Sequence, residues 1–142
     1  MNTRRLLCLL LGWFVSTRDP IANADSVNAR GIIYTSLIRV IATPTNYEGK
    51  EVRLIGYVVV GFEHSALYLS RDDAEHSNRE SSVWIDEPAK SAKIDPMKQG
   101  FACVVGTFHS AGSEGVGHMG LWPGELTNIT LLVRAPKATL PP

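Results

Sequence analysis

The stretch from Gly49 to Glu63 (GKEVRLIGYVVVGFE) restricts the possible folds more than any other part of the chain. Its β-branched and bulky residues are of the types that strands favour, and it is apolar almost without a break from Leu54 to Phe62. A strand this long is expected to change neighbours along its length. Gly56 and Gly61 mark the places for a bend or bulge, because small closed barrels need glycine at such corners. The alternative is an ordinary central strand with incidental glycines.

The remaining strand signals follow this stretch. Three further strands are predicted over Ala66–Ser70 (ALYLS), Ser82–Asp86 (SVWID) and Phe101–His109 (FACVVGTFH), and a fifth within Gly120–Val133. A short helix is expected at Ser36–Ala42 (SLIRVIA), because Thr35 or Ser36 can cap it and it has a wide apolar face. We expect Asp25–Gly31 to be a loose leader, and Arg71–Ser81 to be a charged connection between the second and third strands.

This order of elements resembles an OB-fold, a small five-stranded Greek-key barrel. The resemblance covers about Ser36 to Arg134 and rests on GKEVRLIGYV, ALYLS, SVWID, FACVVGTF and GELTNITLL, in that order. The chain is similar in particular to small exported bacterial OB-fold proteins without an assigned activity. It departs from the usual pattern because its helix precedes the first strand. The resemblance implies a mainly β, five-stranded OB-fold-like barrel with a short N-terminal helix.

The first 24 residues predict a secretory signal peptide. Arg4 and Arg5 give a positive start, residues 6–15 (LLCLLLGWFV) form an apolar segment, and Ala22-Asn23-Ala24 offers a small-x-small cleavage pattern. The apolar segment is shorter than the roughly 20 residues of a transmembrane helix, so no stable membrane span is expected after processing. The alternative is a buried N-terminal helix. We therefore divide the chain into a signal peptide (1–24), a barrel domain (25–134) and a flexible tail (135–142), and expect a periplasmic or secreted protein.

Composition argues against a nucleic-acid partner. The whole chain has 14 basic and 14 acidic residues; cleavage after Ala24 removes three basic residues and one acidic residue, which leaves 11 and 13, a net charge of −2. Nucleic-acid binders usually carry a basic patch, because phosphate contacts supply much of the affinity. Basic residues are scattered along this sequence. Cys103 would be the only cysteine left after processing, and we expect it to be a small buried hydrophobe.

No local motif for a metal, a phosphate group or a catalytic nucleophile is present, so no cofactor is predicted. In an OB-fold the loops after the first and fourth strands flank one binding face. The resemblance therefore implies that His64 lies near His109 and His118, with Glu63 close by. Such a group could hold a divalent transition metal. The alternative is a set of exposed or singly hydrogen-bonded histidines, and the sequence leaves the metal question open.

Three aromatic residues are candidates for the outer face of the barrel. Tyr68, Trp84 and Trp122 are expected on or beside the second, third and fifth strands, where their rings could stack on sugars, bases or peptide side chains. The alternative is that these rings fill the barrel or pack under a loop. Together with the three histidines, they form the predicted ligand-binding set.

The leading hypothesis is a non-catalytic, exported binding module. Its partner would be an unknown protein, peptide or glycan, held by the barrel face and the two loops. One alternative is a single-stranded nucleic-acid-binding OB-fold, a common use of this fold. A second alternative is a metal-dependent enzyme that uses the loop histidines.

Overall fold

A computed structural model describes residues 25–86 and 99–137 of the chain. The predicted signal peptide (1–24), the end of the predicted tail (138–142) and residues 87–98, between the third and fourth barrel strands, lie outside the described residues. Within the described part, no helix has the length and apolar character needed to cross a membrane.

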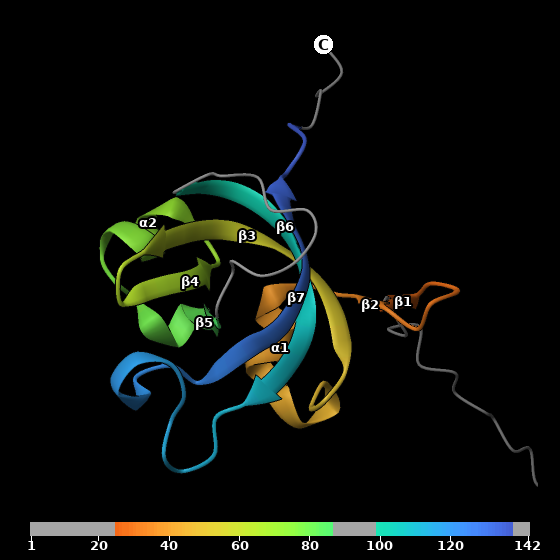
Figure 1. The fold of residues 1–142 in the computed structure, drawn as a ribbon, viewed down its shortest axis with the longest axis horizontal. Helices are drawn as coiled ribbons and strands as arrows, with labels where there is room; N and C mark the ends of the chain where they lie inside the picture. Colours follow the sequence, from red (N-terminus) through yellow and green to blue (C-terminus); the bar gives the residue numbers. More distant parts are fainter. Residues whose placement is uncertain (1–24, 87–98, 138–142) are drawn as a thin grey trace, which may run out of the picture.

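Five strands form a closed barrel (Figure 1). They are β3 (Glu51–Gly61), β4 (His64–Tyr68), β5 (Ser82–Ile85), β6 (Gln99–Ser110) and β7 (Gly124–Arg134). β3, β4 and β5 form an antiparallel meander, and β6 and β7 form an antiparallel pair. β3 then pairs antiparallel with β6, and β5 pairs parallel with β7. This order confirms the mainly β, OB-fold-like Greek-key barrel.

The long strand β3 changes neighbours along its length, as predicted. Its residues Glu51–Val59 pair with β6, whereas Tyr57–Gly61 pair with β4. The two sets of partners overlap over only a short stretch, so β3 belongs to both sides of the barrel. The change of neighbours explains why β3 carries almost no polar alternation after its start, since both of its faces are partly covered.

Gly56 is required in β3 for a reason other than its backbone angles. Its φ lies outside the left-handed region, so its backbone is open to other residues. A Cβ atom at this position would lie 2.5 Å from the carbonyl oxygen of Tyr68 and 3.0 Å from the side chain of Leu67. The strands therefore approach too closely here for any side chain.

A bulge in β7 lies beside the glycine of the fourth barrel strand. Val105 pairs with Leu131, and Thr107 pairs with Thr127. Between these two pairs β6 advances by two residues and β7 by four, so β7 carries the extra residues of the bulge. Asn128 adopts a left-handed φ of 47° within the extra residues. Extra residues of this kind bend a strand and increase its twist, which helps a short sheet to close.

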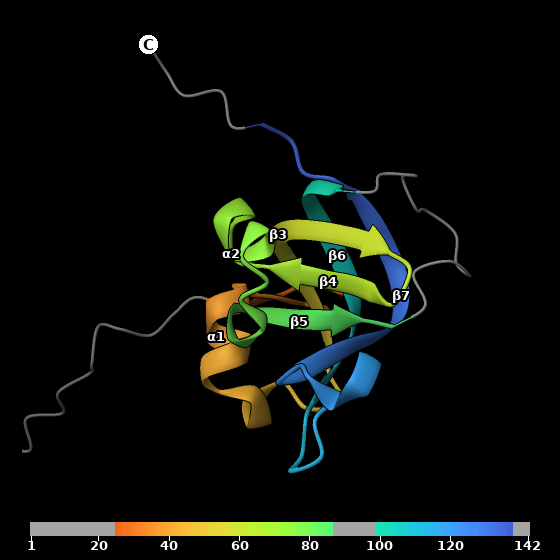
Figure 2. The ribbon, with the colours of Figure 1, turned by 90° about the vertical axis from the view of Figure 1, so that its left-hand side faces the viewer.

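The helix α1 (Leu37–Ala42) closes one end of the barrel (Figure 2). The Ser36 side chain accepts a hydrogen bond from the Arg39 backbone N–H and caps the helix, as predicted. Leu37 and Val40 are completely buried and join the main core. A single turn, η1 (Pro44–Asn46), then leads into β3. The main core consists of inward side chains from all five barrel strands: Val52, Leu54, Val58, Leu67, Val83, Ile85, Ala102, Val104, Phe108, Leu126, Ile129 and Leu132, with Tyr47 beside them.

The charged connection between β4 and β5 contains more regular structure than the sequence suggested. It forms the short helix α2 (Arg71–Glu75) and the 3-10 turn η2 (Arg79–Ser81). Ser70 caps α2, because its hydroxyl accepts a hydrogen bond from the Asp73 backbone N–H. This local capping, rather than an apolar face, explains a helix in so polar a segment.

The predicted loose leader is an ordered arm. β1 (Ser26–Val27) pairs antiparallel with β2 (Ile33–Tyr34), and β2 pairs in parallel with the start of β3. The carboxylate of Asp25 accepts a 2.6 Å hydrogen bond from the Tyr47 hydroxyl and lies 3.4 Å from the Arg39 guanidinium. The expectation of a loose leader was therefore wrong: backbone pairing and these side-chain contacts hold the arm against the barrel.

Candidate functional site

Two loops meet at one end of the barrel, as the resemblance implied. The turn between β3 and β4 contains Phe62 and Glu63, and the loop between β6 and β7 contains the 3-10 turn η3 (His118–Gly120). Figure 1 shows this turn and η3 on the same side of the molecule. The His118 Nε2 atom lies 3.9 Å from the Glu63 carboxylate, and both side chains are partly exposed. We call this pair of loops the loop-tip site.

A cluster of aromatic side chains lies beneath the loop-tip site, on the outer face of β4 and β5. Trp84 and Trp122 pack with ring centroids 4.7 Å apart, and His64 meets Trp122 edge-on at 5.8 Å. The Nε2 atom of His64 lies 2.8 Å from the hydroxyl of Tyr68. We call these four residues the aromatic cluster. Because Ala66, Tyr68 and Trp122 form a buried group separate from the main core, the barrel is covered on this outer face as well as filled inside.

The loop between β6 and β7 is held tightly across the aromatic cluster. Val116 and Trp122 exchange two backbone hydrogen bonds of 3.2 Å, which closes the loop around η3. Gly117 rests on Trp84 so closely that a Cβ atom would lie 2.7 Å from the indole ring, and its φ of 72° also favours glycine. The guanidinium of Arg79 lies 5.4 Å from the centre of the Trp122 ring. The loop is therefore a fixed part of the fold.

Two donors of this region are buried without a partner. Among the described residues, neither the Trp122 indole N–H nor the Arg79 Nε–H has a hydrogen-bond partner. A buried donor left unpaired costs about 1–3 kcal/mol, so the ring packing has to outweigh that cost. Burial, and then the neighbouring charge of Arg79, lower the pKa of His64 below 6.5. His64 is consequently neutral at pH 7, the form in which one ring nitrogen can accept a hydrogen bond.

The predicted aromatic residues come together, but two of the rings are hidden. Tyr68 is 0% exposed and Trp122 is 3% exposed, so both pack under a loop, the alternative that the sequence left open. Trp84, His64 and His118 are partly exposed. Ligand binding by the predicted set stays a prediction; Trp84, His64 and His118, like His109, have side chains that a partner can reach.

The expectation that His64, His109 and His118 meet was wrong. The Nδ1 atom of His109 lies 2.9 Å from Glu48 Oε1, where β6 ends, and the backbone N–H and hydroxyl of Ser110 donate to Glu48 Oε2 at 2.7 and 2.6 Å. The bonds from Ser110, and then that from His109, lower the pKa of Glu48 to about 2. Over residues 25–86 and 99–137, no three His, Cys, Asp or Glu side chains gather closely enough to hold a metal ion.

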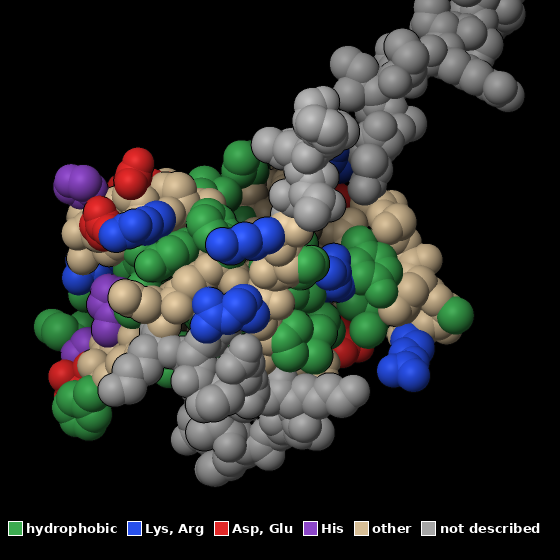
Figure 3. All heavy atoms as spheres, turned by 90° about the horizontal axis from the view of Figure 1, so that it is seen from above, with side chains coloured by type: hydrophobic (Ala, Val, Ile, Leu, Met, Phe, Trp, Pro, Cys, Tyr) green, Lys and Arg blue, Asp and Glu red, His purple; other side chains and the backbone are tan. Residues whose placement is uncertain are grey.

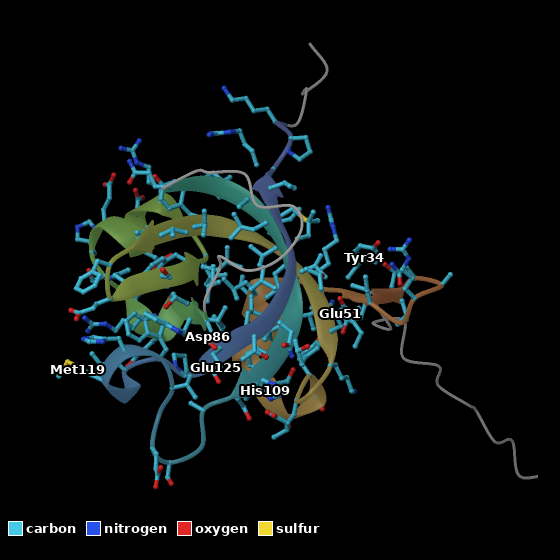
Figure 4. The ribbon with its side chains drawn as sticks, in the orientation of Figure 1. Tyr34, Glu51, Asp86, His109, Met119 and Glu125 are labelled. Atoms are coloured by element: carbon cyan, nitrogen blue, oxygen red, sulfur yellow. The ribbon has the colours of Figure 1, made fainter. Side chains whose placement is uncertain are left out.

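A half-buried carboxyl group is the other titratable feature of the barrel wall. Glu125 lies in register with Trp84 on one side and His109 on the other, and Figure 4 shows it near Asp86. Burial, and then the charge of Asp86, raise the pKa of Glu125 above 4.5. Glu125 therefore takes up a proton more readily than an ordinary glutamate. No local pattern marks this pair, because β5 and β7 meet only in the folded barrel.

The two most exposed large apolar side chains among the described residues, Phe62 and Met119, lie on the loop-tip site, and the sequence analysis missed them. Phe62 is 92% exposed, Met119 is 78% exposed, and Leu121 is 44% exposed. Met119 also has a left-handed φ of 60°, and Figure 4 shows its side chain at the outer edge of the molecule. The available signal was an apolar residue beside glycine in each of two turns, Gly61-Phe62 and Met119-Gly120. Phe62 and Met119 are the tips of the two loops, and the aromatic cluster lies beneath them.

Comparisons of this chain with protein families, with curated proteins and with solved structures found no match.

Proposed function

We propose that this chain is a non-catalytic binding module that docks a protein or peptide through Phe62, Met119 and Leu121. The observation that carries the proposal is the exposure of Phe62 and Met119 on two loops that touch each other. Large aromatic side chains are frequent anchors in interfaces, and methionine adapts to irregular apolar surfaces. These side chains suit an apolar cavity or groove on a partner better than a sugar, which needs flat rings and hydrogen-bonding groups.

The rigid base of the loop-tip site favours binding. Ordering a loop on association costs free energy, and a loop that is already fixed avoids much of this cost. Trp122 and Gly117 fix the β6–β7 loop on the barrel, and the β3–β4 turn is only two residues long. A non-glycine residue such as Met119 in the left-handed region is also strained, and such strain is concentrated at functional positions.

We test this proposal by comparing two double variants in affinity capture from an envelope extract of the native host. Phe62→Ser/Met119→Ser removes the tips, whereas Val27→Ser/Ile38→Ser removes the next two most exposed large apolar side chains, which lie elsewhere. We expect the same partner on the wild type and the control variant, and its loss on the tip variant. Equal capture by all three proteins, or capture of only a soluble glycan, would contradict the proposal.

We further propose that the module acts outside the cytoplasm. The predicted signal peptide supports this, with its positive start at Arg4 and Arg5, its apolar segment and the small-x-small pattern at Ala22-Asn23-Ala24. The intact mass of protein from the native host should correspond to a chain that begins near Asp25. Recovery of only the full-length chain, in the cytosol, would rule out export.

A further inference from the structure

A groove of about 630 Å³ lies on another side of the barrel, where the arm meets β3. Its wall comes from the arm, with Asn28, Arg30 and Tyr34, and its floor comes from β3, β6 and β7. Figure 4 shows Tyr34 and Glu51 on this side, away from Met119 and the loop-tip site. The volume falls within the range of about 300–1,000 Å³ that is usual for small-ligand sites.

Two arginines give the groove its positive charge. Arg30 and Arg53 line it, and neither forms an ion pair with another described residue. The Arg53 guanidinium lies 5.2 Å from the centre of the Tyr34 ring, and the Tyr34 hydroxyl accepts a 3.2 Å hydrogen bond from the Asn28 side chain. The Arg53 side chain is thereby oriented before any ligand arrives, which reduces the entropy lost on binding.

The rest of the groove defines which anion would fit. Glu51 is its acidic residue and accepts a 3.2 Å hydrogen bond from the Thr130 hydroxyl. Two guanidinium groups and one carboxylate give the groove a net charge of +1. This charge suits an anion with a single negative charge better than a doubly charged phosphate. Apolar side chains on the floor, with Ile32 on the arm, add contact area for an apolar body. Figure 3 shows Lys and Arg side chains beside hydrophobic ones at the end of the molecule where the arm lies.

We propose that this groove binds a carboxylate attached to an apolar group. The carboxylate would lie between Arg30 and Arg53, whose planar guanidinium groups match it with paired hydrogen bonds. Its apolar body would lie over Val105 and Leu131, and a peptide ligand could in addition donate an N–H to Glu51. Both the C-terminus of a peptide and a free organic acid have this chemistry. The site does not depend on the loop-tip site, because the two share no residue.

The test is a titration followed by amide NMR signals, with three probes. They are 4-phenylbutanoate, the peptide acetyl-Gly-Gly-Leu-Phe as a free acid, and the same peptide as its C-terminal amide. We expect at least one acid to shift the signals of Tyr34, Arg53 and Thr130. The amide should bind about tenfold more weakly than the peptide acid, as expected when one charge-assisted hydrogen bond is lost. The tighter acid then identifies the source, a peptide terminus or a free acid.

Variants separate this site from a general effect of charge. Arg30→Gln and Arg53→Gln should each weaken binding of the acid about fivefold or more, whereas Arg71→Gln, on α2, should leave it unchanged. Arg30 is exposed and its side chain has no partner among the described residues. Its replacement by Gln is therefore expected to leave the fold of the groove unchanged. Phe62→Ser/Met119→Ser should also bind the acid normally. Absence of shifts, equal binding of acid and amide, or no effect of Arg30→Gln would overturn the proposal.

Discussion

The barrel is closed by two junctions of very different length. The meander β3–β4–β5 and the pair β6–β7 join at two edges. At the long junction, β3 and β6 are paired over nine residues in continuous register. At the short junction, β5 and β7 share only two pairs, Trp84 with Glu125 and Ile85 with Leu126. Side chains supplement the missing backbone bonds there, since Trp122 and the β6–β7 loop pack over the same edge.

The difference shows where stability and the proposed binding function depend on the same residues. At the long junction the backbone ladder holds the strands together, and the nearby surface needs no special side chain. At the short junction the aromatic cluster both closes the barrel and supports the exposed tips Phe62 and Met119. A change in this cluster is therefore expected to affect folding and partner binding together, whereas a change at the tips affects binding alone.

The strongest test of the short junction is Trp122→Ala. The ring is 3% exposed and contacts Trp84 and His64, so its removal leaves a cavity under the loop. We expect the free energy of unfolding to fall by about 3–5 kcal/mol, measured by urea denaturation. The neighbouring variant Leu121→Ala should change it by less than about 0.5 kcal/mol, because Leu121 is exposed. Similar values for both variants would show that the cluster does not close the barrel.

Gly56→Ala tests the close approach of β3 to β4, within the meander. The new methyl group would meet the Tyr68 carbonyl oxygen at 2.5 Å, which is backbone and cannot easily move. We expect a loss of about 1–3 kcal/mol in the free energy of unfolding, from the shift in denaturation midpoint. Gly61→Ala is the matched control, because its nearest atom would be 3.6 Å away. Equal midpoints for the two variants would show that Gly56 is an ordinary strand position.

As the pH falls, the stability of the protein should decrease first through His64, at the short junction, and only at lower pH through Glu48, at the end of the long junction. The pKa of His64 is lowered in the folded state by burial and by Arg79, so below about pH 6.5 the unfolded state binds more protons. Stability is then lost as the pH falls from about 6.5 towards the folded-state pKa, by at most about 1.4 kcal/mol per pH unit. Melting temperatures from pH 8 to pH 5 should show this slope in the wild type, and it should flatten in His64→Gln. An unchanged slope would assign the effect to other groups.

Glu48 should give a smaller loss of stability at lower pH, at the end of the long junction. Hydrogen bonds from Ser110 and His109 lower the Glu48 pKa from 4.5 to about 2, so its contribution is present above pH 4.5 and is lost as the pH falls towards 2. The carboxylate is 46% exposed, and solvent screening limits the effect to about 1 kcal/mol or less. Melting curves of Glu48→Gln between pH 5 and pH 2.5 should vary less than those of the wild type. A parallel decline in both proteins would exclude Glu48 as the cause.

The smallest expected signal concerns nucleic acid. With Tyr68 and Trp122 packed under a loop, the outer face of β4 and β5 offers no open platform for stacked bases. We expect no binding of single-stranded DNA or RNA tighter than about 100 μM at physiological salt, the weak end of non-specific affinity. Fluorescence anisotropy measures this directly. Micromolar binding that weakens steeply with salt, and is lost in Trp84→Ala, would reverse the ranking of the two functions.

Most of the barrel could be predicted because its signals are local. The residues of α1 and of the barrel strands have patterns that can be recognised within one segment, and the predicted ranges overlap the observed elements. The role of Gly56 was predicted at the right position but for a different reason, since the neighbouring strand, rather than the backbone angles, excludes a side chain. The arm was missed because β1 and β2 have two residues each, too few for a period to be visible.

The surroundings of the candidate sites depended on contacts between distant segments. Trp122 was expected on or beside the fifth strand; it lies in the loop before β7, and its packing on Trp84 was not predicted. The groove depends on the parallel register that sets Tyr34 beside Arg53, for which neither segment carries a signal. The partner of His109 lies 61 residues away, so only the folded barrel could separate it from the other histidines.

The register of the long junction also sets the order in which the nascent chain can fold. Its pairs join Glu51 to Thr107 and Val59 to Gln99, separations of 56 residues (107 − 51) and 40 residues (99 − 59). Contacts this distant form slowly, because a long loop must close before they contribute. During synthesis, the edge of β3 that pairs with β6 remains unpaired until residues 99–107 have emerged. A chain that cannot complete its barrel until then keeps this strand edge open during most of its synthesis, and an open edge is a template for pairing with another chain.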